Sequence, residues 1–163
     1  MGGPSHSLAA LAAAVAQLLK RRGETLAVAE SSAGGLINAA LVGVPGASAY
    51  YLGGAVIYTA ASREALLGIQ PSEIEGMRSA TEPMARLLAR RVRERLGASW
   101  GLAETGAAGP SGNRYGDPAG HACLAVHGAV DRAHTVRTAS ADRQANMHAF
   151  ALHALELLES SLR

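Results

Sequence analysis

The stretch AESSAGGL, from Ala29 to Leu36, is the feature that most restricts how this chain can fold. It follows a short apolar run, 25–29, and leads into residues with the apolar spacing of a helix. Such a change of period is typical of a buried strand that turns into a helix. N–H groups at the start of a helix favour anions, and glycines let a backbone approach a ligand closely. The stretch therefore predicts a ligand site at this turn, although a serine here could simply cap the helix.

A second glycine-rich stretch, TGAAGPSGNRYGDPAG at 105–120, follows another expected strand, WGLAE at 100–104. Loops longer than ~12–15 residues in compact domains are usually functional or disordered. In α/β sheets, ligands collect at the carboxyl ends of the strands. If the two strands are parallel neighbours, the turns after Ala29 and Glu104 share one edge of the sheet and form one pocket.

Helical and strand patterns alternate along the rest of the chain. A first helix is expected to be capped by Ser5 or Ser7 and to end at Gly23, and a long helix to be capped by Thr81 and to end at Gly97. We also expect helices over about 34–42 and 62–68 and from about 142, and strands over 25–29, 49–59, 100–104, 121–128 and 134–140, with a bulge or a break at 53–54.

This alternation predicts an α/β fold in which a sheet lies between helical layers. The late pair of strands, expected to form a hairpin around 129–131, makes the sheet mixed. The chain has 163 residues, of which 48% are hydrophobic, so we expect one three-layer domain over 1–163 with its core at about 6–160.

Charge and cysteine content exclude several classes of protein. The net charge of +2 is too small to indicate a dedicated nucleic-acid-binding protein, and an arginine-rich helix over 86–95 is expected to be a solvated face. The single cysteine, Cys123, favours a reducing compartment, and we expect a cytoplasmic protein. No window reaches the ~20 apolar residues of a membrane span, and we expect no signal peptide. The histidines lack metal-site spacing, so no metal is expected.

Three stretches taken together resemble one family. AESSAGG, VPGASAYYLGGAVIYTAASREALLG and TGAAGPSG have the order and spacing of the CinA C-terminal-domain family, the nicotinamide-mononucleotide deamidases, and the tail ADRQANMHAFALHALELL resembles the closing helix of that family. The resemblance covers about 6–160. It implies an α/β/α domain without a metal or cofactor that converts nicotinamide mononucleotide into nicotinic acid mononucleotide and ammonia in pyridine-nucleotide salvage.

The resemblance also implies roles for particular residues. Ser31 matches the first serine of the family's E-S-C-T-G-G motif and would be the nucleophile or position the attacking water. Tyr58 would tune that serine or steady charge. N–H groups over 33–35 would stabilise the oxyanion, and Thr105 with the loop to Gly109 would hold ribose and phosphate. Two further matches, Ser48 and Arg143, would bind phosphate or the carboxamide.

The sequence departs from the family pattern at several of these positions. Arg63 stands where the family usually has lysine, and an arginine stays charged and cannot serve as a base. Glu104 stands where a small or apolar residue is usual, and we hypothesise that it supplies a substitute base. Other departures are Ala33 for threonine, Ala60 for asparagine and Met147 for a second arginine.

The candidate catalytic residues are thus Ser31, Tyr58, Arg63 and Glu104, and the candidate substrate-binding residues are Glu30, Gly34, Gly35, Ser48, Thr105, Gly106, Gly109 and Arg143. Two other functions remain open from the sequence. One is a binding module that holds a pyridine nucleotide without turning it over, and the other is a DNA-associated protein that uses the arginine-rich helix. We also expect a homo-oligomer, a dimer or larger.

Overall fold

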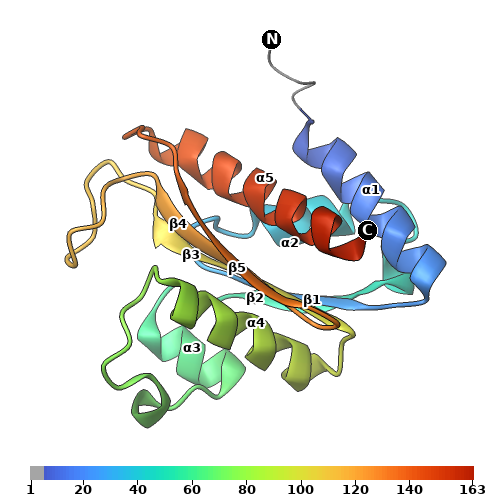
Figure 1. Cartoon of the computed structure of the whole chain (residues 1–163), viewed down its shortest axis with the longest axis horizontal. Coiled ribbons are helices and arrows are strands. Elements are labelled where there is room, and N and C mark those ends of the chain that lie inside the picture. The colour runs from blue at the N-terminus through green and yellow to red at the C-terminus, as the bar shows by residue number, and fades with distance from the viewer. Residues whose placement is uncertain (1–5) are drawn as a thin grey trace.

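A five-stranded sheet lies between two layers of helices in the computed structural model, which describes residues 6–163 (Figure 1). The elements are, in chain order, α1 (Leu8–Arg22), β1 (Leu26–Glu30), α2 (Leu36–Val42), the 3-10 helix η1 (Ala47–Ala49), β2 (Tyr51–Val56), α3 (Ala60–Leu67), the 3-10 helix η2 (Pro71–Ile74), α4 (Glu82–Leu96), β3 (Trp100–Ala107), β4 (His121–His127), β5 (Asp131–Arg137) and α5 (Arg143–Leu162). The predicted α/β class is confirmed.

The sheet has the strand order β2-β1-β3-β4-β5 and is mixed, as predicted. β1 pairs in parallel with both β2 and β3, because the chain crosses over through α2 and then through α3 and α4. β4 and β5 run antiparallel to their neighbours. The two strands that precede the glycine-rich turns are therefore parallel neighbours, as the pocket hypothesis requires.

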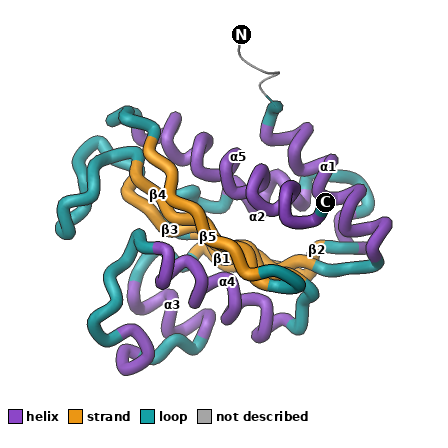
Figure 2. The backbone as a smooth tube through the Cα atoms, in the orientation of Figure 1, coloured by secondary structure: helices purple, strands orange, loops and turns teal. Residues whose placement is uncertain are grey.

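The helices divide between the two faces of the sheet, with α1, α2 and α5 on one face and α3 and α4 on the other (Figures 1 and 2). Alternation along the strands builds a separate core on each face. Leu26 and Val28 of β1 join the core that contains Trp100 and Phe150 on the α1–α5 face. Ala27 and Ala29, which alternate with them, face α4, where small side chains let the helix pack closely on the sheet.

The expected ends of α1 and α4 are confirmed where the structure describes them, whereas α3 begins at Ala60, two residues earlier than expected, because Thr59 caps it. The Ser7 hydroxyl accepts a hydrogen bond from Ala10 N at 3.1 Å, and Thr81 caps α4 in the same way. Gly23 and Gly97 both adopt the left-handed conformation that closes a helix. The alternative cap, Ser5, lies outside the described residues.

Several expected boundaries need correction. The last strand, expected over 134–140, is β5 (Asp131–Arg137), because its pairing with β4 begins at Asp131. β3 continues to Ala107 because Thr105 and the two residues after it pair with β4, so the loop begins later than the glycines suggested. β2 is one strand, with its pairing to β1 shifted next to Leu52 rather than broken. It ends at Val56, so Tyr58 lies in the connection to α3 and does not close the strand.

Candidate active site

The carboxyl ends of β1 and β3 lie side by side. Glu30, the last residue of β1, pairs with Glu104 of β3. Both side chains lie on the face covered by α2 and α5, because Val28 and Leu102, two residues earlier, belong to the core on that face. Both glutamates are fully buried. Two neighbouring carboxyl groups thus lie directly beneath the turn that the sequence singles out.

The Glu30 carboxylate binds the first turn of α2. Its oxygens accept hydrogen bonds from Gly35 N at 2.7 Å, from Ile37 N at 3.3 Å, and from the backbone N and side-chain Nδ2 of Asn38, both at 2.8 Å. Burial raises the pKa of Glu30, and these hydrogen bonds oppose the rise. Its oxygens bond to the chain itself, so the structure places this candidate substrate-binding residue as an anchor of the turn.

The Glu104 carboxylate holds the three residues that follow β1. Oε2 accepts hydrogen bonds from Ser31 N at 3.0 Å and from Ala33 N at 2.8 Å, and Oε1 accepts one from the Ser32 hydroxyl. Burial raises the pKa of this carboxyl to about 7; the hydrogen bonds oppose the rise, and the nearby Glu30 adds to it. A carboxyl with a pKa near neutrality can take up and release a proton at physiological pH.

The turn between β1 and α2 depends on two glycines. Gly34 and Gly35 have φ angles of +69° and +102°, a conformation that side chains rarely adopt. The N–H groups of this turn are already used: Ala33 donates to Glu104, Gly34 to the Ser31 carbonyl, and Gly35 to Glu30. The N–H groups over 33–35 are thus not free to stabilise an oxyanion, contrary to the expectation from the resemblance.

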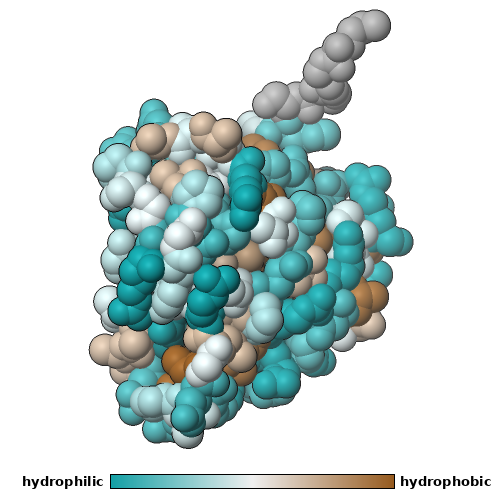
Figure 3. Space-filling view, turned by 60° about the vertical axis from the view of Figure 1, so that its left-hand side comes forward, coloured by the Kyte–Doolittle hydropathy of each residue, from teal (hydrophilic) through white to brown (hydrophobic). Residues whose placement is uncertain are grey.

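A polar cavity of about 270 Å³ opens at this edge of the sheet. It is lined by Ser32, Tyr58, Gly106, Ala107, Ala108, Gly109, Ser111, Gly112, Asn113 and Arg143. Figure 3 brings forward the side of the molecule that carries the loop after β3, and hydrophilic residues cover most of it. The cavity joins the turn after β1 to the end of β3 with its loop, as the pocket hypothesis predicts, and the start of α5 also contributes to its lining.

Arg143 provides the positive charge in the lining of this cavity. Its guanidinium donates to the Gly109 carbonyl at 2.5 Å and to the Tyr58 hydroxyl at 3.0 Å. Arg143 belongs to the first turn of α5, and Asp142 caps that helix by accepting a hydrogen bond from Ala145 N at 3.1 Å. The cavity therefore presents a cation whose direction is fixed by two hydrogen bonds.

Three other candidate residues lie elsewhere. Thr105 faces α4, because residues alternate along β3, and its hydroxyl accepts a hydrogen bond from Ala80 N at 3.2 Å. Arg63 projects from α3 and donates to Ser79 Oγ at 3.2 Å. Ser48 precedes β2, and the first residue of β2 pairs with the first residue of β1. Ser48 therefore lies near the amino-terminal ends of these strands, whereas Glu30 lies at the carboxyl end. The structure brings none of the three to the lining of the cavity.

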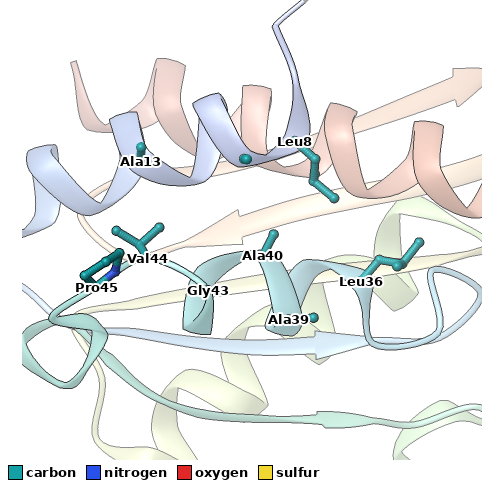
Figure 4. A pocket seen from close by; sticks show the side chains of 9 residues that line it. Leu8, Ala13, Leu36, Ala39, Ala40, Gly43, Val44 and Pro45 are labelled. Carbon is teal, nitrogen blue, oxygen red and sulfur yellow. The ribbon is translucent and has the colours of Figure 1, made fainter.

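A larger hollow, of about 480 Å³, lies between α1 and α2. Its lining is almost entirely apolar, with Leu8 and Ala13 on α1 facing Leu36, Ala40 and Val44 across the gap (Figure 4). Hydrolysis of an amide needs groups that carry protons and stabilise charge, and this hollow offers none. The polar cavity, which joins the turn after β1 to the loop after β3, is the candidate active site.

The structure also adds a site residue that sequence reasoning left without a role. Ser32 lines the cavity, whereas Ser31, the serine singled out by the motif, is not among the lining residues. The available signal was the doubled serine itself, but the sequence does not say which hydroxyl faces a ligand. Within residues 6–163, no group of three or more His, Cys, Asp and Glu side chains is arranged to hold a metal ion.

Comparison with known proteins agrees with this architecture. The profile of the CinA C-terminal domain matches residues 8–162. The chain belongs to the CinA C-terminal domain family. A CinA-like protein of Myxococcus xanthus is 37% identical over 155 residues, which are 94% of this chain and 37% of that protein. One of Prochlorococcus marinus is 44% identical over 118 residues, 72% of this chain and 28% of that protein.

Solved structures of CinA proteins share the whole fold. A CinA superfamily protein from Enterobacter cloacae has a TM-score of 0.91 at 26% identity, and the match covers 100% of this chain and 96% of that one. The competence/damage-inducible protein CihA of Agrobacterium tumefaciens has a TM-score of 0.88 at 28% identity, with 99% of each chain covered. The match to this chain thus spans only 37% of the length of the Myxococcus xanthus relative and 28% of the length of the Prochlorococcus marinus relative. None of its described helices combines the length and apolar character that crossing a bilayer requires.

Proposed function

We propose that this protein hydrolyses the carboxamide of nicotinamide mononucleotide to give nicotinic acid mononucleotide and ammonia. One observation carries the proposal: two polar pairs meet at a single cavity. Ser32 is hydrogen-bonded to the buried carboxyl of Glu104, and Arg143 is hydrogen-bonded to Tyr58. The first pair is suited to an amide and the second to a phosphate. The cavity has a volume of about 270 Å³, slightly below the ~300 Å³ at which the usual range for small-molecule sites begins.

The phosphate end of the substrate is assigned to Arg143. Arginine binds phosphate through a planar pair of N–H donors. The loop after β3 supports this assignment, because among the described residues the backbone N–H groups of Gly109, Ser111 and Gly112 have no hydrogen-bond acceptor. N–H groups of this kind favour an anion. A phosphate at this end would leave the carboxamide to reach the serine turn.

The amide end is assigned to the turn after β1. Amide hydrolysis needs a nucleophile, a base that accepts its proton and an acid that protonates the leaving ammonia. Arg63 cannot be that base, since its guanidinium stays charged and it is absent from the lining of the cavity. Glu104 can take this part, as hypothesised from the sequence, because it lies directly beneath the turn and its pKa is raised to about 7.

The alternative of a DNA-binding face on α4 is disfavoured by pairing of its arginines. Arg86 and Arg91 each form an ion pair, with Asp131 and Glu73 respectively, and Arg93 donates to the carbonyl groups that follow the helix. Phosphate binding releases counterions only where cationic groups are free to contact it. An arginine face whose charge is largely neutralised by neighbours gives DNA little to bind.

The experiment that tests the proposal is ammonia release from nicotinamide mononucleotide by the purified protein, with nicotinamide riboside for comparison. We expect release from the mononucleotide and much slower release from the riboside, which has no phosphate for Arg143. If calorimetry detects binding of the mononucleotide but no ammonia is released, the proposed enzymatic activity is overturned and the protein is a non-catalytic binding module. Salt-sensitive DNA binding without affinity for the nucleotide would favour the third possibility.

A further inference from the structure

Ser32 and Glu104 form a preorganised hydroxyl–carboxyl pair. The Ser32 hydroxyl donates to Oε1 of the carboxylate. The other carboxylate oxygen, Oε2, accepts from the backbone N–H groups of Ser31 and Ala33, the residues on either side of Ser32. The hydrogen bonds to the residues on either side of Ser32 therefore fix the carboxylate against the serine hydroxyl. Neither group has to move for a proton to pass between them.

Their burial differs in a way that suits a nucleophile and its base. Glu104 is fully buried and has no route to solvent of its own. Ser32 is only 5% exposed, yet it lines the polar cavity that also contains Arg143 and Tyr58. A substrate in this cavity would contact the serine and not the glutamate. Ser31 is more exposed, but its hydroxyl has no partner among residues 6–163 and does not line the cavity.

We propose that Ser32 is the nucleophile of the reaction and that Glu104 is its general base. This assignment rests on the amide hydrolysis proposed above and replaces Ser31, the nucleophile implied by the resemblance. Both members of the pair are departures from the family pattern, which has cysteine and a small or apolar residue at these positions. The serine and the carboxyl thus depart from the family pattern together, and Arg63, which lies outside the lining of the cavity, takes no part in the pair.

The reaction balances with this pair alone and one water molecule. The Ser32 oxygen forms a bond to the carboxamide carbon while its proton passes to Glu104. The C–N bond then breaks, and the same proton moves to the departing nitrogen, so that ammonia leaves and an acyl ester on Ser32 remains. Water attacks the ester, Glu104 takes a proton from that water, and the proton returns to the Ser32 oxygen as the carboxylic acid is released.

The surroundings of Glu104 fit the part of a base that works near neutral pH. Burial is the largest influence on its pKa and raises it to about 7, and the charge of Glu30 on the neighbouring strand acts in the same direction. A base is most effective when its pKa is close to the working pH. The backbone N–H of Ser32 has no acceptor among the described residues and is thus available as a donor to the oxyanion.

The competing explanation is that the pair has a purely structural role, because Glu104 also holds the turn. Glu104→Gln keeps the size of the side chain and can still accept from the two N–H groups, but glutamine cannot take a proton. A structural part predicts that this variant keeps most of its activity and its reactivity toward electrophiles. The proposed part predicts loss of both in a protein that remains folded.

The experiment compares Ser32→Ala, Ser31→Ala, Glu104→Gln and the surface control Ser72→Ala, each checked for folding by circular dichroism. Ammonia release should fall by roughly a thousandfold or more in Ser32→Ala and Glu104→Gln. It should fall less in Ser31→Ala and stay unchanged in Ser72→Ala. A larger loss in Ser31→Ala than in Ser32→Ala would overturn the assignment while leaving the proposed function intact.

A second readout separates failure of the assignment from failure of the function. The wild-type protein is treated with a fluorophosphonate, which modifies activated serines, and the modified peptide is located by mass spectrometry. We expect an adduct on Ser32 that forms at least tenfold more slowly in Glu104→Gln. An adduct on Ser32 in a protein that releases no ammonia would support the pair and refute only the substrate. A folded protein with no adduct on Ser32, or with one on Ser31, would overturn the pair.

Discussion

Glu30 and Glu104 occupy paired positions on neighbouring parallel strands, and both carboxyl groups are buried beneath the same turn. The two carboxylates accept hydrogen bonds from different parts of the turn. Glu104 holds the residues that leave β1, and Glu30 holds the first residues of α2. The division explains how a buried charge is tolerated here, because each carboxylate gains several donors in place of water.

The raised pKa of Glu104 makes stability depend on pH. Its pKa is about 7 in the folded protein against an ordinary value of 4.5, so the folded state holds the proton more tightly. The corresponding stability is fully present below about pH 4.5 and is lost as the pH rises through about 7, a change of roughly 3 kcal/mol at most. Glu104→Gln does not titrate, so we expect it to gain stability relative to the wild type as the pH rises.

Urea denaturation of both proteins at about pH 5 and about pH 8 measures this change. Glu64→Gln on α3 is the control, because Glu64 is exposed, and its difference from the wild type should not vary with pH. A constant difference between Glu104→Gln and the wild type at both pH values would contradict the prediction.

Removal of the Glu30 side chain should destabilise the fold strongly. Glu30→Ala leaves the N–H groups of Gly35 and Asn38 without their acceptor beneath a packed turn. A buried donor left without a partner costs roughly 1–3 kcal/mol, so we expect a loss of at least about 2 kcal/mol in the free energy of unfolding. Chemical denaturation checks this, with Glu64→Ala as the exposed counterpart. A loss no larger than that of the control would mean that water replaces the carboxylate.

Arg143 should discriminate between substrates with and without a phosphate. Loss of a charged hydrogen bond costs about 1.5–3 kcal/mol, so Arg143→Ala should weaken binding of nicotinamide mononucleotide by roughly 10- to 100-fold. Nicotinamide riboside, which lacks the phosphate, should bind about equally to both proteins. Calorimetric titration measures both affinities, and Arg132→Ala on β5 serves as a control for loss of an exposed charge. Equal weakening for the two ligands would remove Arg143 from the phosphate site.

Gly34 should tolerate alanine less well than another glycine of the same backbone conformation. Gly34 and Gly97 have φ angles of +69° and +66°. A Cβ at Gly34 would lie 2.6 Å from the Met147 methyl group, while a Cβ at Gly97 would have open space around it. Both substitutions introduce backbone strain of about 1 kcal/mol, and only Gly34→Ala adds a clash. Thermal unfolding should show the larger decrease for Gly34→Ala, and equal decreases would show that Met147 moves aside freely.

The local patterns of the sequence were enough to predict much of the fold. Capping residues such as Thr81 and Asp142, and glycines such as Gly23 and Gly97, act within a few residues of themselves, so the helix ends they mark were found without a structure. The change from strand to helix at AESSAGGL is equally local. The mixed sheet followed from the order of these elements, since a strand that returns through a helix pairs in parallel.

The composition of the site was decided by tertiary structure. Which of Ser31 and Ser32 lines the cavity depends on how Glu104, more than seventy residues away, binds the turn between them. Thr105 follows Glu104 directly, yet the alternation of β3 turns it to the other face of the sheet. The sequence by itself determined that a serine turn and a glycine-rich loop each follow a strand, and the parallel pairing of β1 with β3 brought them to one end of the sheet. Strand register, which is fixed by pairing between distant segments, decided which side chains meet there.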